Sequence, residues 1–268
     1  MPRVDTQPEA TTSRAWWCSP SAWGVLFAVG VWHARRSPGR PASSRRGTLP
    51  PGQRRVDGFP RFGTHLSDPP PVVPPTPTID VTGAIQAPLT VALTDLDDLP
   101  PVDQVSDFHC VAGWSATGLR WEGVSFSTFY RTLIAPRLTP GTTVTHLVFR
   151  GLDGFASVVQ LDDALADDVL IATRLDGRPL SGAHGAPVRL VSPRQYGYIN
   201  TKHLCSIEVH PSEPRLEHPL SRFQLIASHP RGRVWMEERH PTYPIAVIGP
   251  IYRAIGRAGL WLIARRAR

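Results

Sequence analysis

The sequence predicts an α+β fold in which strands dominate and helices are short connectors. Its 29 prolines and 22 glycines divide the 268 residues into short segments, a pattern typical of many strands joined by turns. Several of these segments are apolar runs rich in β-branched residues, or alternate apolar and polar side chains, as strands do. With 41% hydrophobic residues, the chain is long enough to bury a substantial core.

The first elements follow a proline-rich arm at residues 49–77. Because proline runs such as 69–71 favour an extended backbone, we expect a surface arm without regular secondary structure. Residues 78–85 then alternate apolar and polar side chains, which predicts a half-buried strand, and residues 89–93 predict a second one.

The expected helices in the middle of the chain are short. Residues 95–99 predict a helical turn that ends at two prolines. Residues 126–134 are the best helix candidate, because Phe126, Phe129, Tyr130 and Leu133 fall on one side at helical spacing.

Strands are expected to continue in the second half. Residues 143–150 and 155–161 are apolar, β-branched runs separated by Gly151-Leu152-Asp153-Gly154, which predicts a hairpin with a glycine-bearing loop. Further strands are expected at residues 169–175, 188–192 and 206–210.

Most of the excess of basic over acidic residues lies at the two ends of the chain. Lys+Arg exceeds Asp+Glu by 29 − 22 = 7, and the excess lies at residues 35–55 and 253–268. We expect residues 1–48 to form a disordered extension, residues 49–238 to form the one functional domain, and residues 239–268 to form a basic amphipathic segment. A helix docked on the domain and a membrane-surface or protein contact both remain open for this last segment.

Charge and cysteine usage exclude several classes of protein. Basic flanks without a recognition motif do not predict nucleic-acid binding. Cys18, Cys110 and Cys205 are too scattered for a disulfide framework or a CxxC metal site, which favours a reducing compartment. The apolar run 22–32 is shorter than the roughly 20 residues that span a bilayer, and its arginines follow it, unlike those of a signal peptide. We therefore expect a cytoplasmic protein.

Three segments carry candidate chemistry. Cys110 stands where a strand-like run meets a glycine turn, which would hold a thiolate rigidly. A lone cysteine is more often a small buried hydrophobic residue than a metal ligand or nucleophile. The neighbouring segments therefore decide whether Cys110 has a chemical role. Downstream, His184 and Arg189 flank a Gly and a Pro, an arrangement that suits an anionic ligand. The stretch from Gly197 to Lys202 offers backbone N–H groups and a positive charge for a phosphate or polar heterocycle.

Together these segments resemble the sulfite-oxidase-type molybdopterin oxidoreductase family, in which a cysteine ligates molybdenum and a HGxPxR stretch followed by a glycine and an xxK stretch holds the pterin. Similar segments occur at residues 60–65, 121–124 and 149–154, and Leu180 precedes His184. The resemblance covers about residues 49–211. It implies a strand-rich α+β fold with mixed sheets and short helices.

The resemblance also implies the roles of individual residues. Cys110 would be the molybdenum ligand and catalytic residue. The implied cofactor-binding residues are Phe62, Gly63, Thr64, His65, Asp153, His184, Arg189, Asn200, Thr201 and Lys202. With molybdopterin and molybdenum as cofactors, the implied reaction is oxygen-atom transfer or a related two-electron reaction on a small substrate, because thiolate and dithiolene sulfur suit such a metal.

Two departures from the family pattern affect the substrate and the architecture. Ile199 stands where the family commonly has an arginine or lysine, which puts an anionic substrate such as sulfite in doubt. The aromatic and basic residues that follow Lys202 in true sulfite oxidases are missing, as is an appended dimerisation domain, so a minimal cofactor-binding domain is expected. Without a CxxCH haem motif, electrons would pass through a separate carrier or redox partner.

Two alternatives compete with this interpretation. His109, Cys110, His184 and Cys205 are the residue types that zinc prefers, although none form a closely spaced pair and neighbours on a strand point to opposite faces. The second alternative is a non-catalytic cofactor-binding or interaction module.

Overall fold

A long hairpin carries Cys110 at its tip. Strands β4 (Pro101–Cys110) and β5 (Trp114–Ser125) are antiparallel and are joined by a tight turn in which Gly113 has a φ of 87°. The strand-like run before Cys110 is confirmed. The length of the hairpin was not predicted, because the apolar residues of β4 do not alternate with polar ones as in a typical strand.

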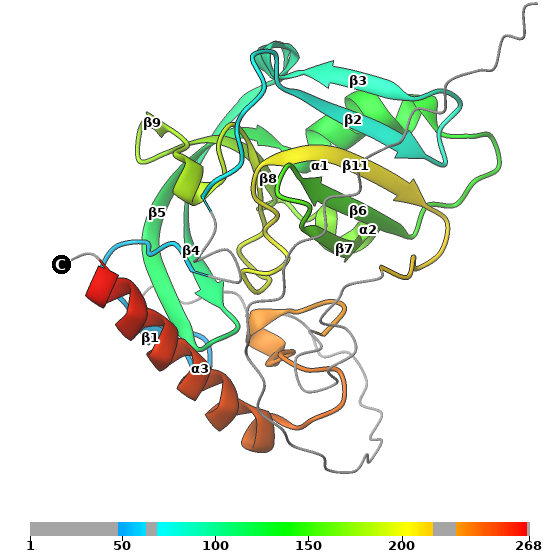
Figure 1. Cartoon of the computed structure of the whole chain (residues 1–268). Helices are drawn as coiled ribbons and strands as arrows, with labels where there is room; N and C mark the ends of the chain where they lie inside the picture. The colour runs from blue at the N-terminus through cyan, green and yellow to red at the C-terminus, as the bar shows by residue number, and fades with distance from the viewer. Residues whose placement is uncertain (1–47, 63–68, 217–228, 267–268) are drawn as a thin grey trace, which may run out of the picture. The chain divides into compact units, whose positions relative to one another are not determined.

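The computed structural model describes residues 48–62, 69–216 and 229–266, all of which belong to the unit formed by residues 33–268. Two sheets and one long helix make up the described part (Figure 1), so the predicted α+β class is confirmed. Except for Thr48, the predicted N-terminal extension lies outside the described residues, as does Cys18.

The first sheet is built around β5. Its strand order is β1-β5-β8-β10, with β4 paired to β5 and β9 paired to β8. The additional strands are β1 (Arg54–Arg55), β8 (Leu170–Leu175), β9 (Arg178–Pro179) and β10 (Arg189–Val191). β1 runs parallel to β5 and the other pairs are antiparallel, so the sheet is mixed.

The second sheet has the order β3-β2-β11-β6-β7. Its strands are β2 (Thr78–Gly83), β3 (Leu89–Ala92), β6 (His146–Gly151), β7 (Ala156–Gln160) and β11 (Leu204–His210). β11 is parallel to β2 and antiparallel to β6. The predicted strands and the predicted β6–β7 hairpin are confirmed within a few residues at each end.

The helical segments other than the last one are short, as predicted, and α1, η3 and η4 follow one another directly. They are η2 (Leu93–Asp98), α1 (Phe126–Phe129), the π turn η3 (Tyr130–Ile134), η4 (Ala135–Arg137), α2 (Leu161–Ala164), η5 (Gly182–His184) and η7 (Val234–Met236). The exception is α3 (Ile245–Arg266). Among the described residues, no helix combines the length and the apolar character needed to cross a membrane.

Two apolar clusters hold these elements together. The larger contains residues of both sheets and the α1 side chains Phe126 and Phe129, so the predicted apolar side of this helix is confirmed. The smaller contains Cys110, Trp114 and Trp121 of the hairpin. The described parts of the arm lack regular structure apart from β1, but the arm is not confined to the surface, because Phe59 packs against the smaller cluster.

Candidate active site

Cys110 is held at the end of β4 by its backbone. Its carbonyl accepts hydrogen bonds from Gly113 N (2.9 Å) and from Gln53 Nε2 (3.1 Å) in the arm. Burial raises the pKa of the Cys110 thiol to about 12, while the positive charges of Arg239 and Lys202 act in the opposite direction. A buried thiol of this kind keeps its proton until a bound metal cation replaces it.

The segment from His184 to Arg189 folds back on itself. Its backbone reverses at Gly185, which is in the left-handed region (φ 105°), and at the cis Ala186-Pro187 peptide bond. The fully buried Arg189 guanidinium then donates hydrogen bonds to three carbonyl oxygens: His184 O at 2.9 Å, Leu190 O at 3.3 Å and Asn200 O at 3.1 Å. Arg189 therefore ties the HGxPxR segment directly to the segment that leads to Lys202.

Aromatic rings surround this arginine and histidine. Phe59 stacks on the His184 ring with 4.6 Å between centroids, and the Arg189 Cζ lies 5.2 Å from the Trp121 ring centroid and 5.8 Å from that of Phe108, within cation–π range. Burial lowers the pKa of Arg189 to about 9. Burial, and then the charges of Arg189 and its neighbours, lower the pKa of His184 to about 4.

Lys202 links Cys110 to this cluster. Its Nζ donates a hydrogen bond to Ala183 O at 2.8 Å. Burial, followed by the charges of Arg189 and Arg61, lowers the pKa of Lys202 to about 7, and the charges of Asp153 and Cys110 oppose this shift. The structure thus gathers Cys110, Asp153, His184, Arg189 and Lys202, all predicted site residues, into one electrostatically coupled cluster with an excess of cations.

Asn200 and Thr201 are in a different situation. The Asn200 amide accepts a hydrogen bond from Ser192 N at 2.7 Å and donates one to Tyr196 O at 3.2 Å. The Thr201 hydroxyl lies 2.7 Å from the Ser157 hydroxyl. Both side chains are buried and used within the protein, and their main-chain N–H and C=O groups are also hydrogen-bonded to other parts of the chain. Their predicted side-chain contact with pterin stays a prediction.

The arm contributes less than was predicted to the described site. Phe62 packs against Trp114, with 5.5 Å between ring centroids. Its ring also lies so close to Gly259 of α3 that a Cβ added to this glycine would be 2.4 Å away. The other predicted arm residues, Gly63, Thr64 and His65, lie outside the described residues.

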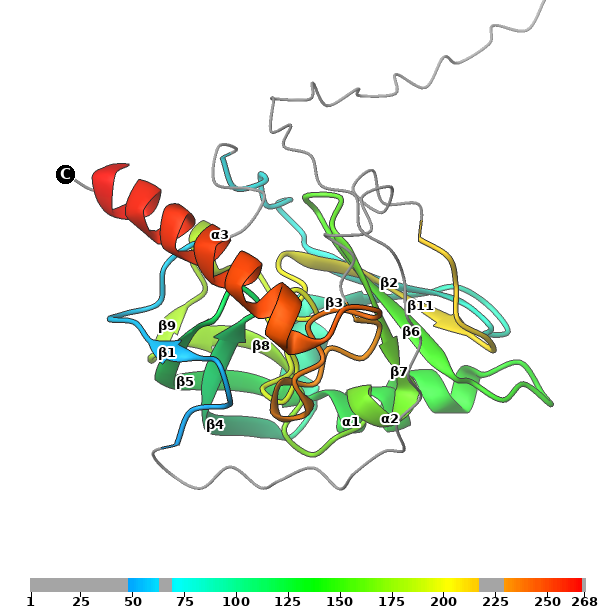
Figure 2. The same cartoon turned by 90° about the horizontal axis from the view of Figure 1, so that it is seen from below.

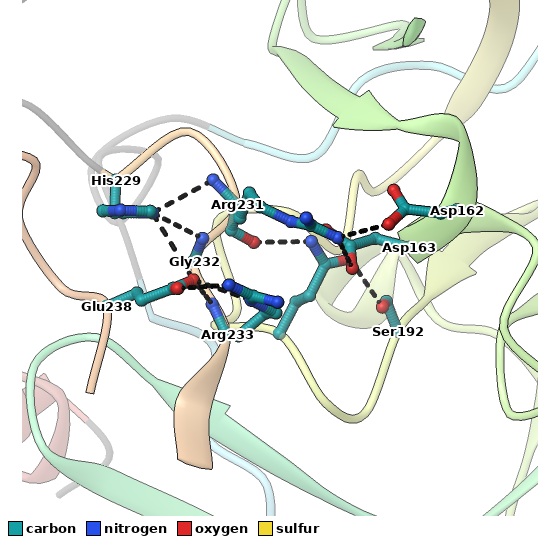
Figure 3. Close-up of polar contacts among 9 residues, drawn as sticks. Asp162, Asp163, Ser192, His229, Arg231, Gly232, Arg233 and Glu238 are labelled. Carbon is teal, nitrogen blue, oxygen red and sulfur yellow. Dashed lines mark hydrogen bonds and ion pairs between the residues drawn. The ribbon is translucent and has the colours of Figure 1, made fainter. Parts of the chain in front are cut away.

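A set of ion pairs clamps the segment that follows residue 228 (Figure 3). Arg231 reaches Asp163 on α2 through Nε–Oδ2 (2.6 Å) and Nη2–Oδ1 (2.5 Å). Arg233 pairs with Glu238 at 2.6 Å. His229 Nδ1 accepts hydrogen bonds from the backbone N–H of Arg231 (3.1 Å) and of the next residue (3.3 Å). These contacts fix the loop that leads to Arg239.

The buried position of His229 in these contacts predicts that the stability of the protein depends on pH. Burial, and then nearby arginines, lower the pKa of His229, while Glu238 opposes the shift. Below a pH of about 6.5 the unfolded chain binds a proton at this histidine that the folded chain does not, so the free energy of unfolding decreases as the pH falls. We expect His229→Asn, whose Oδ1 can accept the same bonds, to flatten thermal stability measured between pH 7 and 5. His146→Gln serves as the control, and a slope for His229→Asn equal to that of wild type would contradict the prediction.

Arg239 is a site residue that the sequence did not indicate. It is fully buried, its Nε donates to Tyr196 Oη at 3.1 Å and it pairs with Glu237 at 3.3 Å. A Cβ added to Gly113 would lie 3.5 Å from Arg239 Nη1. The Arg239 guanidinium therefore lies beside the turn that follows Cys110. Phe59, Gln53 and Phe108 were missed as well. Arg239, Phe59 and Gln53 reach the site from distant segments without a motif, and Phe108 lies two residues before Cys110 but belongs to no motif, so no signal in the sequence marks them.

The zinc alternative is wrong for the described residues. Within these ranges, no group of three or more His, Cys, Asp or Glu side chains is placed to hold a metal ion. His109 instead lies 2.8 Å from the Ser115 hydroxyl, and the Cys205 thiol lies 3.5 Å from Arg150 O. Cys110 therefore has no protein co-ligands of the kind a structural zinc ion needs.

A comparison with models of known protein families shows to which family the chain belongs. The family model described as the oxidoreductase molybdopterin binding domain matches residues 65–217, more than half of the chain. The chain belongs to this family. It is therefore a molybdopterin-dependent oxidoreductase with molybdopterin and molybdenum as cofactors, which removes the non-catalytic alternative.

Individual relatives in this family agree. The chain is 28% identical over 198 residues to the uncharacterized oxidoreductase YuiH of Bacillus subtilis, covering 74% of this chain and 94% of YuiH. It is 29% identical over 178 residues to the protein-methionine-sulfoxide reductase catalytic subunit MsrP of Ralstonia nicotianae, covering 59% of this chain and 52% of MsrP. The chain thus spans about half the length of this reductase. The sulfane dehydrogenase SoxCD from Paracoccus pantotrophus aligns with a TM-score of 0.48 and 18% identity, over 62% of this chain and 45% of SoxCD.

The residues at the site fit the family's cofactor. Burial lowers the pKa of Arg189 and of the half-buried Lys202, and the charge of Arg189 lowers the pKa of Lys202 further. An anionic phosphate beside these cations would oppose both shifts. His184 Nδ1 is buried without a hydrogen-bond partner, which leaves an orphan polar atom at the same place. The Cys110 thiol lies in an apolar surrounding and is of the soft sulfur type that would suit molybdenum.

Proposed function

We propose that the chain transfers an oxygen atom between water and a small substrate, with the Cys110 thiolate ligating the molybdenum. The observation that carries the proposal is the coupling of Cys110 to Lys202, Arg189 and His184 in one buried, cation-rich cluster. Bound there, the cofactor would supply a metal that changes its oxidation state by two electrons while an oxo group is gained or lost.

The protein's own residues would bind and orient. Lys202 and Arg189 provide the positive charge that a pterin phosphate needs, and the backbone of the segment from His184 to Lys202 provides the rigid frame. The ring of Phe59 and the other aromatic side chains exclude water from this region. Cys110 is fixed through its carbonyl, and a backbone hydrogen bond from Ala112 to its sulfur favours the thiolate that a metal would bind.

We favour reduction of a sulfoxide as the reaction: a sulfoxide, two electrons and two protons give a sulfide and water. The relative MsrP is named a protein-methionine-sulfoxide reductase. Ile199 stands where the family commonly has a cation, and its side chain packs in the main core. This position therefore supplies no positive charge for an anionic substrate such as sulfite, which favours an uncharged sulfoxide. The electrons would come from a separate redox partner, and MsrP is likewise named as a catalytic subunit.

The proposal predicts which cysteine controls the metal content. Purified wild type from a host that makes the cofactor should contain about one molybdenum and one pterin per chain. Cys110→Ser should lose molybdenum but keep much of the pterin, because the cation cluster is unchanged. Cys205→Ser is the matched control, since Cys205 is half-buried on β11, and it should keep both.

Elemental analysis and fluorescence of the released, oxidised pterin measure this directly. Activity follows from the same samples: wild type with a reduced viologen should convert methionine sulfoxide to methionine, and Cys110→Ser should not. Unchanged molybdenum in Cys110→Ser would refute the ligand assignment. Sulfite oxidation without sulfoxide reduction would refute the favoured direction.

A further inference from the structure

Helix α3 packs on the active-site hairpin with one face. Ile248 and Tyr252 are buried, and a Cβ on Gly256 would lie 2.3 Å from Ala112 O. Leu260 packs against the cluster that contains Cys110. Figures 1 and 2 both show the helix beside the tip of the β4–β5 hairpin. The docked helix predicted as one alternative is therefore present.

One exposed side of α3, next to the docked face, is apolar. Val247, Ile251, Ile255 and Trp261 are 55%, 42%, 53% and 59% exposed. The first three recur every four residues, so they form a stripe along one side of the helix. Large apolar side chains exposed in such a row exceed what a solvated helix needs.

The charges of α3 are all of one sign. It contains Arg253, Arg257, Arg265 and Arg266 and no aspartate or glutamate. Arg253, Arg257 and Arg265 are exposed, and the Arg265 guanidinium lies 5.4 Å from the centroid of the Trp261 ring. Arg253, Arg257, Trp261 and Arg265 also recur every four residues, so they lie along the other exposed edge of the helix. An exposed side with an apolar stripe at one edge and arginines with a tryptophan at the other is complementary to a surface that is apolar inside and anionic outside.

We propose that the outer face of α3 binds the surface of an anionic lipid bilayer, with the helix lying in the plane of the interface. The apolar stripe would enter the region between headgroups and acyl chains, and the arginines would contact anionic headgroups. Docking in this way leaves the turn after Cys110 about one helix diameter, ~10 Å, from the bilayer. This inference is independent of the metal ligand.

The test is co-sedimentation of the purified full-length protein with vesicles of phosphatidylcholine, alone or mixed with phosphatidylglycerol. Wild type should bind the mixed vesicles, bind the neutral ones much more weakly, and dissociate as salt is raised. Arg257→Gln with Arg265→Gln should weaken binding about 30-fold, because each arginine near an anionic surface contributes about 1 kcal/mol. Arg131→Gln with Arg178→Gln is the charge-matched control and should bind as wild type.

The stripe is tested separately. Ile251→Asn with Ile255→Asn should abolish most binding, whereas Val105→Asn, at a 67% exposed valine on β4, should not. Unchanged melting temperature and molybdenum content would show that the variants are folded. Binding that persists in both α3 variants would assign lipid binding to another segment and overturn the proposal. Equal binding to neutral vesicles, no binding, or self-association lost in the same variants would overturn it too.

Discussion

Replacing Arg189 with methionine is expected to lower the free energy of unfolding of the cofactor-free protein by about 3 kcal/mol. Methionine replaces the stem of the side chain but cannot donate, so the carbonyls of His184, Leu190 and Asn200 lose a common donor in a buried region. Relief from burying the charge offsets only part of this loss, because the guanidinium is already stabilised by three aromatic rings.

Denaturant unfolding of matched variants measures the effect. Arg174→Met is the control, because Arg174 is an exposed residue of β8 whose ion pair with Glu122 lies at the surface, and it should cost less than about 1 kcal/mol. Arg189→Lys keeps the charge but lacks the planar fork, so it should fall between the two. Equal losses for Arg189→Met and Arg174→Met would show that these three bonds do not stabilise the fold.

Replacing Gly256 with valine is expected to destabilise the protein by about 2 kcal/mol and to lower its molybdenum content. Its Cβ would lie 2.3 Å from Ala112 O and 3.1 Å from the Ala112 Cβ, so α3 must move away from the turn that follows Cys110. Loss of this support should loosen the position of Cys110.

Thermal melting and elemental analysis of the purified variant check both parts. Ala258→Val provides the control on the same helix, because Ala258 is exposed and there valine costs only the few tenths of a kcal/mol of lower helix propensity. If Gly256→Val melts at the same temperature as Ala258→Val, α3 does not support the hairpin.

Local pattern predicted the regular elements of the fold well. Apolar–polar alternation and the spacing of glycines are visible within a few consecutive residues. They predicted the strands of the second sheet, the turn at α1 and the β6–β7 hairpin. The β4–β5 hairpin escaped detection because the apolar residues Val102, Val105 and Phe108 of β4 are three apart and do not alternate with polar ones as in a typical strand. Its pairing with β5, rather than its own composition, makes it a strand.

The sequence by itself determined the fold class, the family and the positions of Cys110, His184, Arg189 and Lys202, since these residues belong to short contiguous motifs. Only the tertiary structure decided how they act on one another. The shifted pKa values of Lys202 and His184 arise from burial and from charges that approach across the fold, because electrostatic interactions strengthen where water is excluded. Arg239, Phe59 and α3 reach the site through contacts between distant segments, and no local pattern encodes such contacts.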